Sequence, residues 1–324
     1  MPAHPFLQRL AEPRPLLLDG ATGTELNRRG VSTDLPLWSA RALLEAPDIL
    51  RQIHADYLAA GAEVLTTNTF RAHRRSLARA GLGARARELT FLAAQIAAEI
   101  PNPKSQIPNQ KTGDRGPETE IPNLKSQIPN LKSQIILAGS LAPLEDCYSP
   151  ELVPPPAECE REHAEMAQNL AEAGVDFILI ETMNTAREAA AAAQAAAATG
   201  LPFAVSFVCR SDGRLFSGES VTAAARAVLP FGPALLGINC TPTLTLHEPL
   251  AELAAVTTLP LAAYGNVGHT DDVSGWTLTD DVPPEEYARY AARWLETAPN
   301  LRLLGGCCGT SPAHIRALRA LVDG

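Results

Sequence analysis

The sequence predicts a single (β/α)8 barrel of the α/β class, and two regularities support this prediction. Eight short apolar runs alternate with Ala-rich helical stretches along the 324 residues, and eight strand–helix units are the number that closes such a barrel. Most of the runs show little alternation of polar and apolar residues, as expected for parallel strands buried on both faces. An open doubly wound sheet fits less well, because Gly20-Ala21-Thr22-Gly23 lacks the spacing of a dinucleotide-binding loop.

Strands and helices are expected in strict alternation. The strands are expected at residues 16–21, 63–69, 135–141, 177–182, 203–208, 235–240, 261–266 and 301–307. The helices are expected at residues 41–60, 82–99, 158–173, 185–199, 219–229, 245–256, 284–297 and 311–322. Two of the helix starts, Asn184-Thr185 and Thr310-Ser311-Pro312, combine a capping side chain or a proline with the first turn, which favours a helix N-terminus.

Residues 100–134 differ from the rest of the chain. They form five units of seven residues, four of them clearly alike, and every unit contains a proline. The prolines exclude a coiled coil, and units this short cannot build a solenoid. We interpret the segment as an extended, solvent-exposed, low-complexity insertion between the second helix and the third strand, without a chemical role. Residues 1–324 are therefore expected to form one barrel domain that contains this insertion.

The composition limits the partners and the location of the protein. Lys and Arg number 27 against 36 Asp and Glu, a net charge of −9, whereas a nucleic-acid partner requires a basic face. We expect no nucleic acid as partner and no membrane span, since no apolar stretch reaches the ~18 residues that a span needs. The N-terminus lacks the apolar run of a signal peptide, so a cytoplasmic location is expected. Six cysteines are too sparse for a disulfide scaffold.

Three of the six cysteines are expected at the ends of two nearby strands. Cys240 ends the sixth strand, and Cys307 and Cys308 end the eighth, with only the seventh strand between them. Glycines surround the Cys-Cys pair and permit the backbone to direct two neighbouring side chains at one centre. Three thiolates suit Zn²⁺ and leave a fourth position open, as in catalytic zinc sites. The alternative is a set of ordinary buried cysteines.

Two carboxylates, Asp19 and Glu181, also end apolar strands. An unpaired carboxylate is costly to bury, so each needs a cation, either a substrate ammonium group or an arginine such as Arg71 or Arg187. The turn that starts at Gly20 offers backbone N–H groups to a carboxylate, as an anion-binding nest does. An ammonium group and a carboxylate together describe an amino acid.

At these residues the chain resembles the zinc-dependent homocysteine S-methyltransferase family, outside the insertion, from about residue 15 to 320. The most specific stretches are Gly237-Ile238-Asn239-Cys240 and Gly305-Gly306-Cys307-Cys308-Gly309. Supporting stretches are Leu18-Asp19-Gly20-Ala21-Thr22-Gly23, Leu37-Trp38-Ser39-Ala40, Thr67-Asn68-Thr69-Phe70, Ile180-Glu181-Thr182 and Tyr264-Gly265-Asn266.

The resemblance implies a barrel enzyme with Zn²⁺ on the three cysteines and the homocysteine thiol at the open position. Zinc ligation deprotonates a thiol whose ordinary pKa is about 8.5, so the thiolate attacks a methyl group without a general base, and His269 is expected to be merely solvated. The substrate residues that the resemblance implies are Asp19 and Glu181 for the ammonium group, the Gly20 and Ala21 backbone for the carboxylate, and Asn68 and Thr69 beside them. Asn266 is the implied fourth ligand without substrate. Trp38, in the loop after the first strand, is the aromatic residue that we nominate as the wall for a cationic donor.

The methyl donor stays open at this stage. A donor that binds directly in the barrel mouth is expected, because no folate or corrinoid module follows the last helix, and sulfonium and betaine donors are both cations that suit an aromatic residue beside a negative metal site. A sulfonium donor, S-methylmethionine or S-adenosylmethionine, is favoured, because Leu37-Trp38-Ser39-Ala40 resembles the S-methylmethionine branch of the family. Betaine is one alternative, and methyltetrahydrofolate with a corrinoid is another, since Thr67-Asn68-Thr69-Phe70 resembles the first module of methionine synthase. A zinc or thiol sensor without catalytic activity is the alternative from a different class of protein. The partners expected are homocysteine and a methyl donor.

Overall fold

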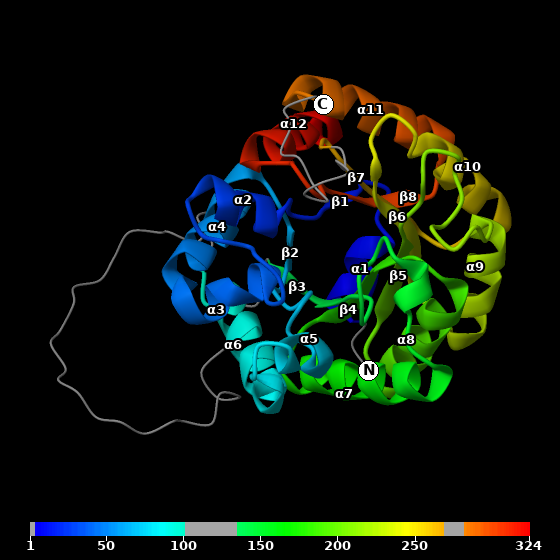
Figure 1. Cartoon of the computed structure of the whole chain (residues 1–324). Helices are drawn as coiled ribbons and strands as arrows, with labels where there is room; N and C mark the ends of the chain where they lie inside the picture. The colour runs from blue at the N-terminus through cyan, green and yellow to red at the C-terminus, as the bar shows by residue number, and fades with distance from the viewer. Residues whose placement is uncertain (1–3, 101–134, 269–281) are drawn as a thin grey trace, which may run out of the picture.

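The computed structural model describes residues 4–100, 135–268 and 282–324. Its eight strands form one parallel sheet in the order β1-β8-β7-β6-β5-β4-β3-β2, and a parallel bridge between Leu18 and Val64 joins the two ends. The predicted barrel is therefore confirmed, and Figure 1 shows it along its axis with helices around it. The strands are β1 (Leu16–Leu17), β2 (Val64–Thr66), β3 (Ile136–Leu141), β4 (Phe177–Met183), β5 (Phe203–Phe207), β6 (Leu235–Pro242), β7 (Leu261–Asn266) and β8 (Leu301–Leu304).

Three strands end at least three residues earlier than expected: β1, β2 and β8. Their last expected residues leave the ladder because the chain turns into close contact with its neighbours there. The Gly306 N–H donates to the Asp19 carbonyl at 3.1 Å, and a Cβ atom on Gly305 would lie only 2.7 Å from the Leu18 Cβ atom. The shortened strands leave these loop residues at the mouth of the barrel.

The eight expected helices are present, with one correction and three additions. The expected helix at 41–60 is two helices, because Ala46 lies outside the helical region, with φ −146° and ψ 49°, and a residue before proline disfavours helical geometry. The sequence did not indicate α1, α2 or α5. The helices are α1 (Pro5–Leu10), α2 (Thr22–Arg28), α3 (Ala42–Glu45), α4 (Pro47–Ala60), α5 (Arg74–Ala78), α6 (Ala86–Ala98), α7 (Pro156–Glu172), α8 (Ala186–Ala198), α9 (Val221–Val228), α10 (His247–Val256), α11 (Pro284–Thr297) and α12 (Pro312–Asp323). Among these described helices, none has the length and apolar character needed to cross a bilayer.

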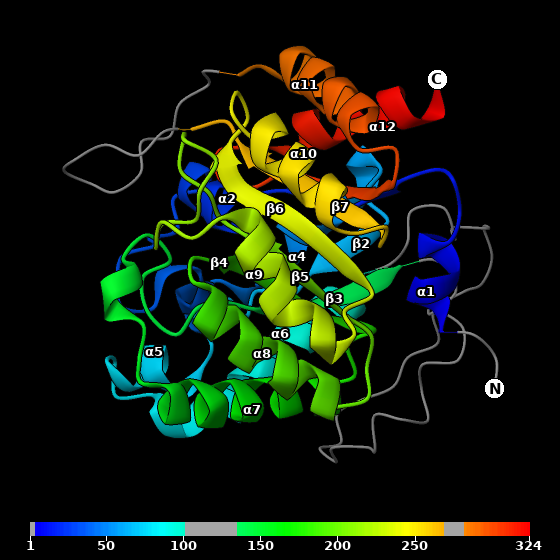
Figure 2. The ribbon, with the colours of Figure 1, turned by 90° about the vertical axis from the view of Figure 1, so that its right-hand side faces the viewer.

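The core has an inner and an outer layer. Inward-facing residues such as Leu16, Phe177 and Leu235 fill the barrel, and residues of the opposite strand faces pack against the helices. Helix α1 covers one end of the barrel, as Figure 2 shows, and its fully buried Phe6 stacks on Phe177 with ring centroids 3.8 Å apart. The opposite end, where the strands terminate, is left for the loops that carry the candidate site.

The segment predicted to be an insertion begins one residue later than expected. Ile100 is 1% exposed and belongs to the outer core layer, so it is part of the barrel. The rest of the segment, residues 101–134, lies outside the described residues. The start of β3, which follows this segment in sequence, lies at the end of the barrel that α1 covers, where Ile136 belongs to the same core cluster as Phe6.

Replacing residues 101–134 with a short Gly-Ser linker is expected to leave catalysis nearly unchanged. Loops that precede barrel strands lie on the face opposite the active site, so kcat and KM should stay within about twofold of the full chain. Steady-state kinetics and thermal unfolding of both proteins provide the measurement. A large loss of kcat in a shortened protein that unfolds at the same temperature would contradict the assignment of the segment to this end.

Candidate active site

A cavity of about 480 Å³ lies at the C-terminal ends of the strands. The residues that line it come from the loops after β1, β2, β3 and β8 and from the ends of β4, β6 and β7. The predicted site residues on its wall are Asp19, Gly20, Ala21, Trp38, Asn68, Glu181, Cys240, Cys307 and Cys308. Thr69 and Asn266 are not on this wall, and His269 lies outside the described residues.

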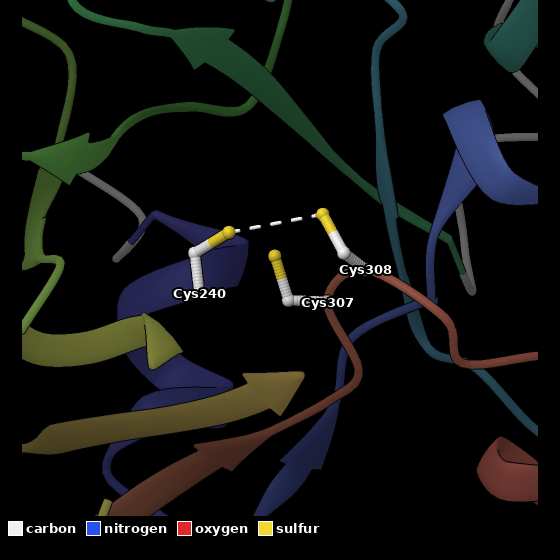
Figure 3. Close-up of side chains that lie close together, drawn as sticks. All are labelled: Cys240, Cys307 and Cys308. Carbon is white, nitrogen blue, oxygen red and sulfur yellow. Dashed lines mark hydrogen bonds between the residues drawn. The ribbon is translucent and has the colours of Figure 1, made fainter. Parts of the chain in front are cut away.

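The three cysteines of the predicted site form one cluster. Their sulfur atoms all lie within 4.8 Å of one another, and the Sγ atoms of Cys240 and Cys308 are 3.8 Å apart. Figure 3 shows the three side chains turned towards a common point. Among the described residues this is the one group of three or more Cys, His, Asp or Glu side chains that could hold a metal ion.

The backbone at both ends of this cluster is unusual in a way that aims the sulfurs. Cys240 has a φ of 51°, and the register of β6 against β7 shifts between Asn239 and Pro242. On the other side, a Cβ atom on Gly306 would lie 2.3 Å from the Thr310 Oγ1 atom, so only glycine allows this turn before the Cys-Cys pair. Strained, non-glycine backbone of this kind concentrates at functional sites.

A tyrosine that sequence reasoning missed contacts the cluster. The Tyr148 hydroxyl lies 3.1 Å from the Cys240 Sγ atom, and Cys147 beside it lines the cavity. Hydrogen bonds from Cys307 and Cys308, reinforced by one from Tyr148, hold the pKa of the Cys240 thiol well below its usual range. The loop after β3 is an expected place for such a residue, but nothing in its local sequence indicates that Tyr148 reaches β6.

The carboxyl groups of Asp19 and Glu181 are buried beside the cluster. Asp19 accepts hydrogen bonds from the Thr66 amide at 2.9 Å and the Thr66 hydroxyl at 2.8 Å, and Glu181 accepts one from the Ser140 hydroxyl. Burial raises the pKa of Asp19 to about 7. Burial, with smaller contributions from Cys240 and Asp19, raises the pKa of Glu181 to about 8.

Neither carboxyl group has a cationic partner among the described residues. The two arginines that the sequence offered as partners for these acids bond elsewhere. Arg71 donates to the Glu145 carbonyl at 3.3 Å, and Arg187 donates to the Pro154 carbonyl at 2.6 Å. Two buried acids that face one cavity and have no cationic partner among the described residues are suited to a ligand that brings positive charge.

The Gly20–Ala21 turn is held against the end of the barrel. The Ala21 N–H donates to the Thr310 hydroxyl at 3.2 Å, and the Ala21 carbonyl accepts from the Tyr57 hydroxyl at 3.2 Å. A Cβ atom on Gly20 would lie 2.8 Å from both Thr310 and Tyr57. Glycine is therefore required for this close approach to the cavity wall.

Trp38 and Phe70 form an aromatic corner of the cavity. Their ring centroids are 5.4 Å apart in an edge-to-face arrangement, and Trp38 has a φ of 48°. A Cβ atom on Gly23 would lie 2.7 Å from the Trp38 ring, so this glycine admits the indole. Asn68, next to this corner, donates its side-chain amide to the Ser39 carbonyl at 2.8 Å.

The two expected residues off the cavity wall have other contacts. The Thr69 hydroxyl is buried and donates to the Ser140 carbonyl at 2.7 Å, so it holds the loop after β2 against β3. The Asn266 side-chain amide donates to the Cys240 carbonyl at 2.8 Å. Its buried Oδ1 atom has no hydrogen-bond partner in the part of the chain that the structure describes.

Comparisons with known proteins agree with this site. The sequence model of the family described as homocysteine S-methyltransferase matches residues 16–322. The homocysteine S-methyltransferase YbgG of Bacillus subtilis is 30% identical over 97% of this chain and 96% of its own length. The selenocysteine methyltransferase of Astragalus bisulcatus is 30% identical over 96% of this chain and 93% of its own length.

A solved structure shares the fold over nearly the whole chain. The metallated form of the homocysteine methyltransferase MmuM from Escherichia coli superposes with a TM-score of 0.74 at 27% identity, covering 95% of this chain and 96% of that one. The family match extends over more than nine-tenths of the residues, and it includes every strand and both halves of the cysteine cluster. The chain is a methyltransferase that belongs to the homocysteine S-methyltransferase family.

Proposed function

We propose that this chain forms methionine by transferring a methyl group from a sulfonium donor, S-methylmethionine or S-adenosylmethionine, to homocysteine, with Zn²⁺ bound by Cys240, Cys307 and Cys308. One observation carries the proposal: the three-thiol cluster and two buried acids without a cation share the wall of one cavity. The first feature suits a metal that binds sulfur, and the second suits the ammonium group of an amino acid. The whole chain, residues 1–324, acts as one domain.

The cysteine cluster fits zinc by its dimensions as well as by its chemistry. Tetrahedral zinc with Zn–S bonds of about 2.3 Å separates two sulfur ligands by about 3.8 Å, and the Cys240 and Cys308 sulfurs lie 3.8 Å apart. Three protein ligands leave a fourth position for substrate or for a protein group. When bound, zinc supplies the acceptor sulfur as a thiolate at neutral pH.

The remaining side chains orient the acceptor. Asp19 and Glu181 receive the ammonium group of homocysteine, which provides the cation that both buried acids lack. The Gly20–Ala21 turn receives the carboxylate, for which the Ala21 N–H exchanges its bond to the Thr310 hydroxyl, and Asn68 borders this part of the cavity. We assign Asn266 as the fourth ligand without substrate, because its buried Oδ1 atom has no partner among the described residues.

The aromatic corner of Trp38 and Phe70 supports a cationic donor. A sulfonium group that rests on an aromatic face is stabilised by the ring quadrupole, and the carboxylates on the same wall add attraction. Among the donors considered, S-methylmethionine, S-adenosylmethionine and betaine carry the positive charge on the atom that loses methyl, whereas methyltetrahydrofolate and a methylated corrinoid do not. The selenocysteine methyltransferase among the relatives makes selenocysteine a second acceptor worth testing.

Methionine formation from homocysteine by reduced, zinc-loaded protein tests this function. S-methylmethionine is the first donor, followed by S-adenosylmethionine, betaine and a methylated corrinoid under the same conditions. Methionine from the sulfonium donors supports the proposal. Zinc-loaded protein that binds homocysteine but forms methionine only from betaine or the corrinoid would replace the donor class, and protein that turns over none of them would support the sensor reading.

The pH dependence of kcat/KM for homocysteine is expected to rise through the range of the two buried acids. Their raised pKa values, about 7 for Asp19 and about 8 for Glu181, leave both groups neutral at pH 6 and ionised above pH 8.5. An ammonium group is bound by the ionised form, so kcat/KM should increase at least about tenfold from pH 6 to pH 8.5. The Glu181→Gln variant should lose the component of this rise near pH 8, and an unchanged profile in that variant would contradict the role of Glu181.

A further inference from the structure

Arg71 is a buried cation on the cavity wall that the functions assigned so far leave unused. It follows β2, lines the cavity and is 9% exposed. Its Nη1 atom donates to the Glu145 carbonyl at 3.3 Å. Its Nε and Nη2 atoms make no hydrogen bond to any residue that the structure describes. A guanidinium group has five N–H donors, so most of the donor capacity of Arg71 remains free.

The arginines that follow Arg71 in sequence show what it lacks. Arg74 pairs with Glu165 at 2.8 Å, and Arg75 pairs with Glu162 at 2.7 Å. Arg75 and Arg79 also take both carboxylate oxygens of Glu145, which leaves Arg71 only the carbonyl of that residue. Within the described residues Arg71 has no ion pair. A buried charge without a counter-ion is costly, so an anion is expected to complete this part of the cavity.

The charged side chains on the cavity wall are acidic, except for this arginine. Four carboxylates line the wall, Asp19, Asp34, Asp146 and Glu181, and Arg71 is the one cationic side chain among the described lining residues. The Arg71 guanidinium carbon lies 5.9 Å from the centroid of the Phe70 ring, and Phe70 packs on Trp38. The single positive group therefore adjoins the aromatic corner proposed for the donor cation.

We propose that Arg71 is an anion subsite that binds the carboxylate of the sulfonium donor, a group that S-methylmethionine and S-adenosylmethionine share. The inference rests on the proposed function. The sulfonium group lies at the Trp38–Phe70 corner, and the carboxylate of the same molecule reaches the neighbouring guanidinium. The donor C–S bond breaks as the homocysteine thiolate forms the new one, and the electron pair stays on the donor sulfur, which leaves as a neutral thioether. Arg71 keeps its charge throughout and acts on binding and orientation.

Arg71 is assigned to the donor and not to homocysteine because of its place on the wall. The carboxylate of homocysteine is already assigned to the Gly20–Ala21 turn, which leads directly from Asp19. Arg71 and the aromatic residue next to it both come from the loop after β2. A guanidinium binds a carboxylate through two parallel hydrogen bonds, which fixes the orientation of the donor as well as its affinity.

A pair of donors that differ in one group tests the subsite. We would compare S-methylmethionine with its methyl ester, using zinc-loaded wild type, Arg71→Gln, Arg71→Lys and the control Arg74→Gln, whose partner Glu165 lies away from the cavity. Wild type should prefer the free acid by about 10- to 100-fold in kcat/KM, the range of a charge-assisted hydrogen-bonded pair. Arg71→Gln should lose this preference because its kcat/KM falls for the free acid and stays unchanged for the methyl ester. Arg71→Lys should retain part of the preference, and Arg74→Gln should retain all of it.

The KM for homocysteine and the zinc content separate this outcome from others. Both should change by less than about twofold in Arg71→Gln. A preference for the free acid that persists in Arg71→Gln would overturn the inference, and so would a selective rise in the KM for homocysteine, which would assign Arg71 to the acceptor. An equal loss of kcat/KM for the free acid and for the methyl ester in Arg71→Gln would indicate a structural role and would also overturn the inference. Arg71→Lys keeps the charge, so a carboxylate contact predicts that it retains part of the preference for the free acid.

Failure of the proposed function can be distinguished from failure of the carboxylate subsite. If zinc-loaded wild type forms no methionine from any donor, calorimetric titration of S-methylmethionine and its methyl ester still tests the subsite. Tighter binding of the free acid to wild type, and not to Arg71→Gln, would uphold the carboxylate contact without turnover. Equal binding of the acid and the ester to wild type would refute it.

Discussion

Cys307→Ser is expected to reduce the bound metal from about one ion per chain to near zero and to abolish methyl transfer. A serine hydroxyl is a far weaker ligand for zinc than a thiolate, and the cluster would retain only Cys240 and Cys308, whose sulfurs are 3.8 Å apart. Without the metal the acceptor thiol is only a few per cent ionised at pH 7. We expect kcat/KM to fall by more than about 1,000-fold, given the nucleophile's dependence on the metal.

Metal analysis of the purified protein and single-turnover assays provide the measurement. Cys159→Ser is the control, since Cys159 lies on α7, is fully buried, donates to the Pro154 carbonyl and does not line the cavity. It should keep its metal and its activity. Full metal stoichiometry in Cys307→Ser would mean that the metal is held elsewhere, and the site assignment would fall.

Glu181→Ala is expected to weaken homocysteine binding about 100-fold while leaving the metal in place. The loss corresponds to one charge-assisted hydrogen-bonded pair of about 1.5–3 kcal/mol. Glu181 contacts the Ser140 hydroxyl but belongs to no metal-binding group in the described chain, so the two functions should separate. Equilibrium binding of homocysteine to zinc-loaded protein, together with metal analysis, measures both.

Glu181→Gln distinguishes charge from shape in the same experiment. The amide keeps the volume of the side chain and a hydrogen bond to Ser140, but it cannot balance an ammonium group. It should bind homocysteine nearly as weakly as Glu181→Ala. If Glu181→Gln binds like wild type, the charge is not what the substrate needs. If either variant loses its metal, Glu181 is a ligand or a support of the cluster.

The extent to which the sequence anticipated the site follows from the geometry of the barrel. Parallel strands bring their C-terminal ends together, so Cys240 and the Cys307-Cys308 pair could be placed near one another once the strands were counted. Asp19 and Glu181 could be placed at the same end by the same reasoning. These inferences needed only the order and number of the strands, which the repeated apolar runs make visible.

The details that the sequence left open depend on contacts between distant loops. Whether Arg71 or Arg187 neutralises the acids was undecided until both were seen to bond to backbone carbonyls. The contact of Tyr148 with Cys240 joins residues 92 positions apart. The exclusion of Thr69 from the cavity wall depends on its bond to Ser140 on the neighbouring strand, and no local pattern encodes such a bond.

The sequence by itself determined that this chain is an eight-stranded barrel with three cysteines and two acids at one end, because hydrophobic periodicity and strand count are local properties of a chain. Only the tertiary structure decided which side chains face the cavity and which are satisfied elsewhere. The shift of β6 register at Cys240, the break at Ala46 and the unpaired guanidinium of Arg71 all arise from how separate segments pack. Long-range packing overrides local propensity at these points, and they are the points at which the chemistry of the site is set.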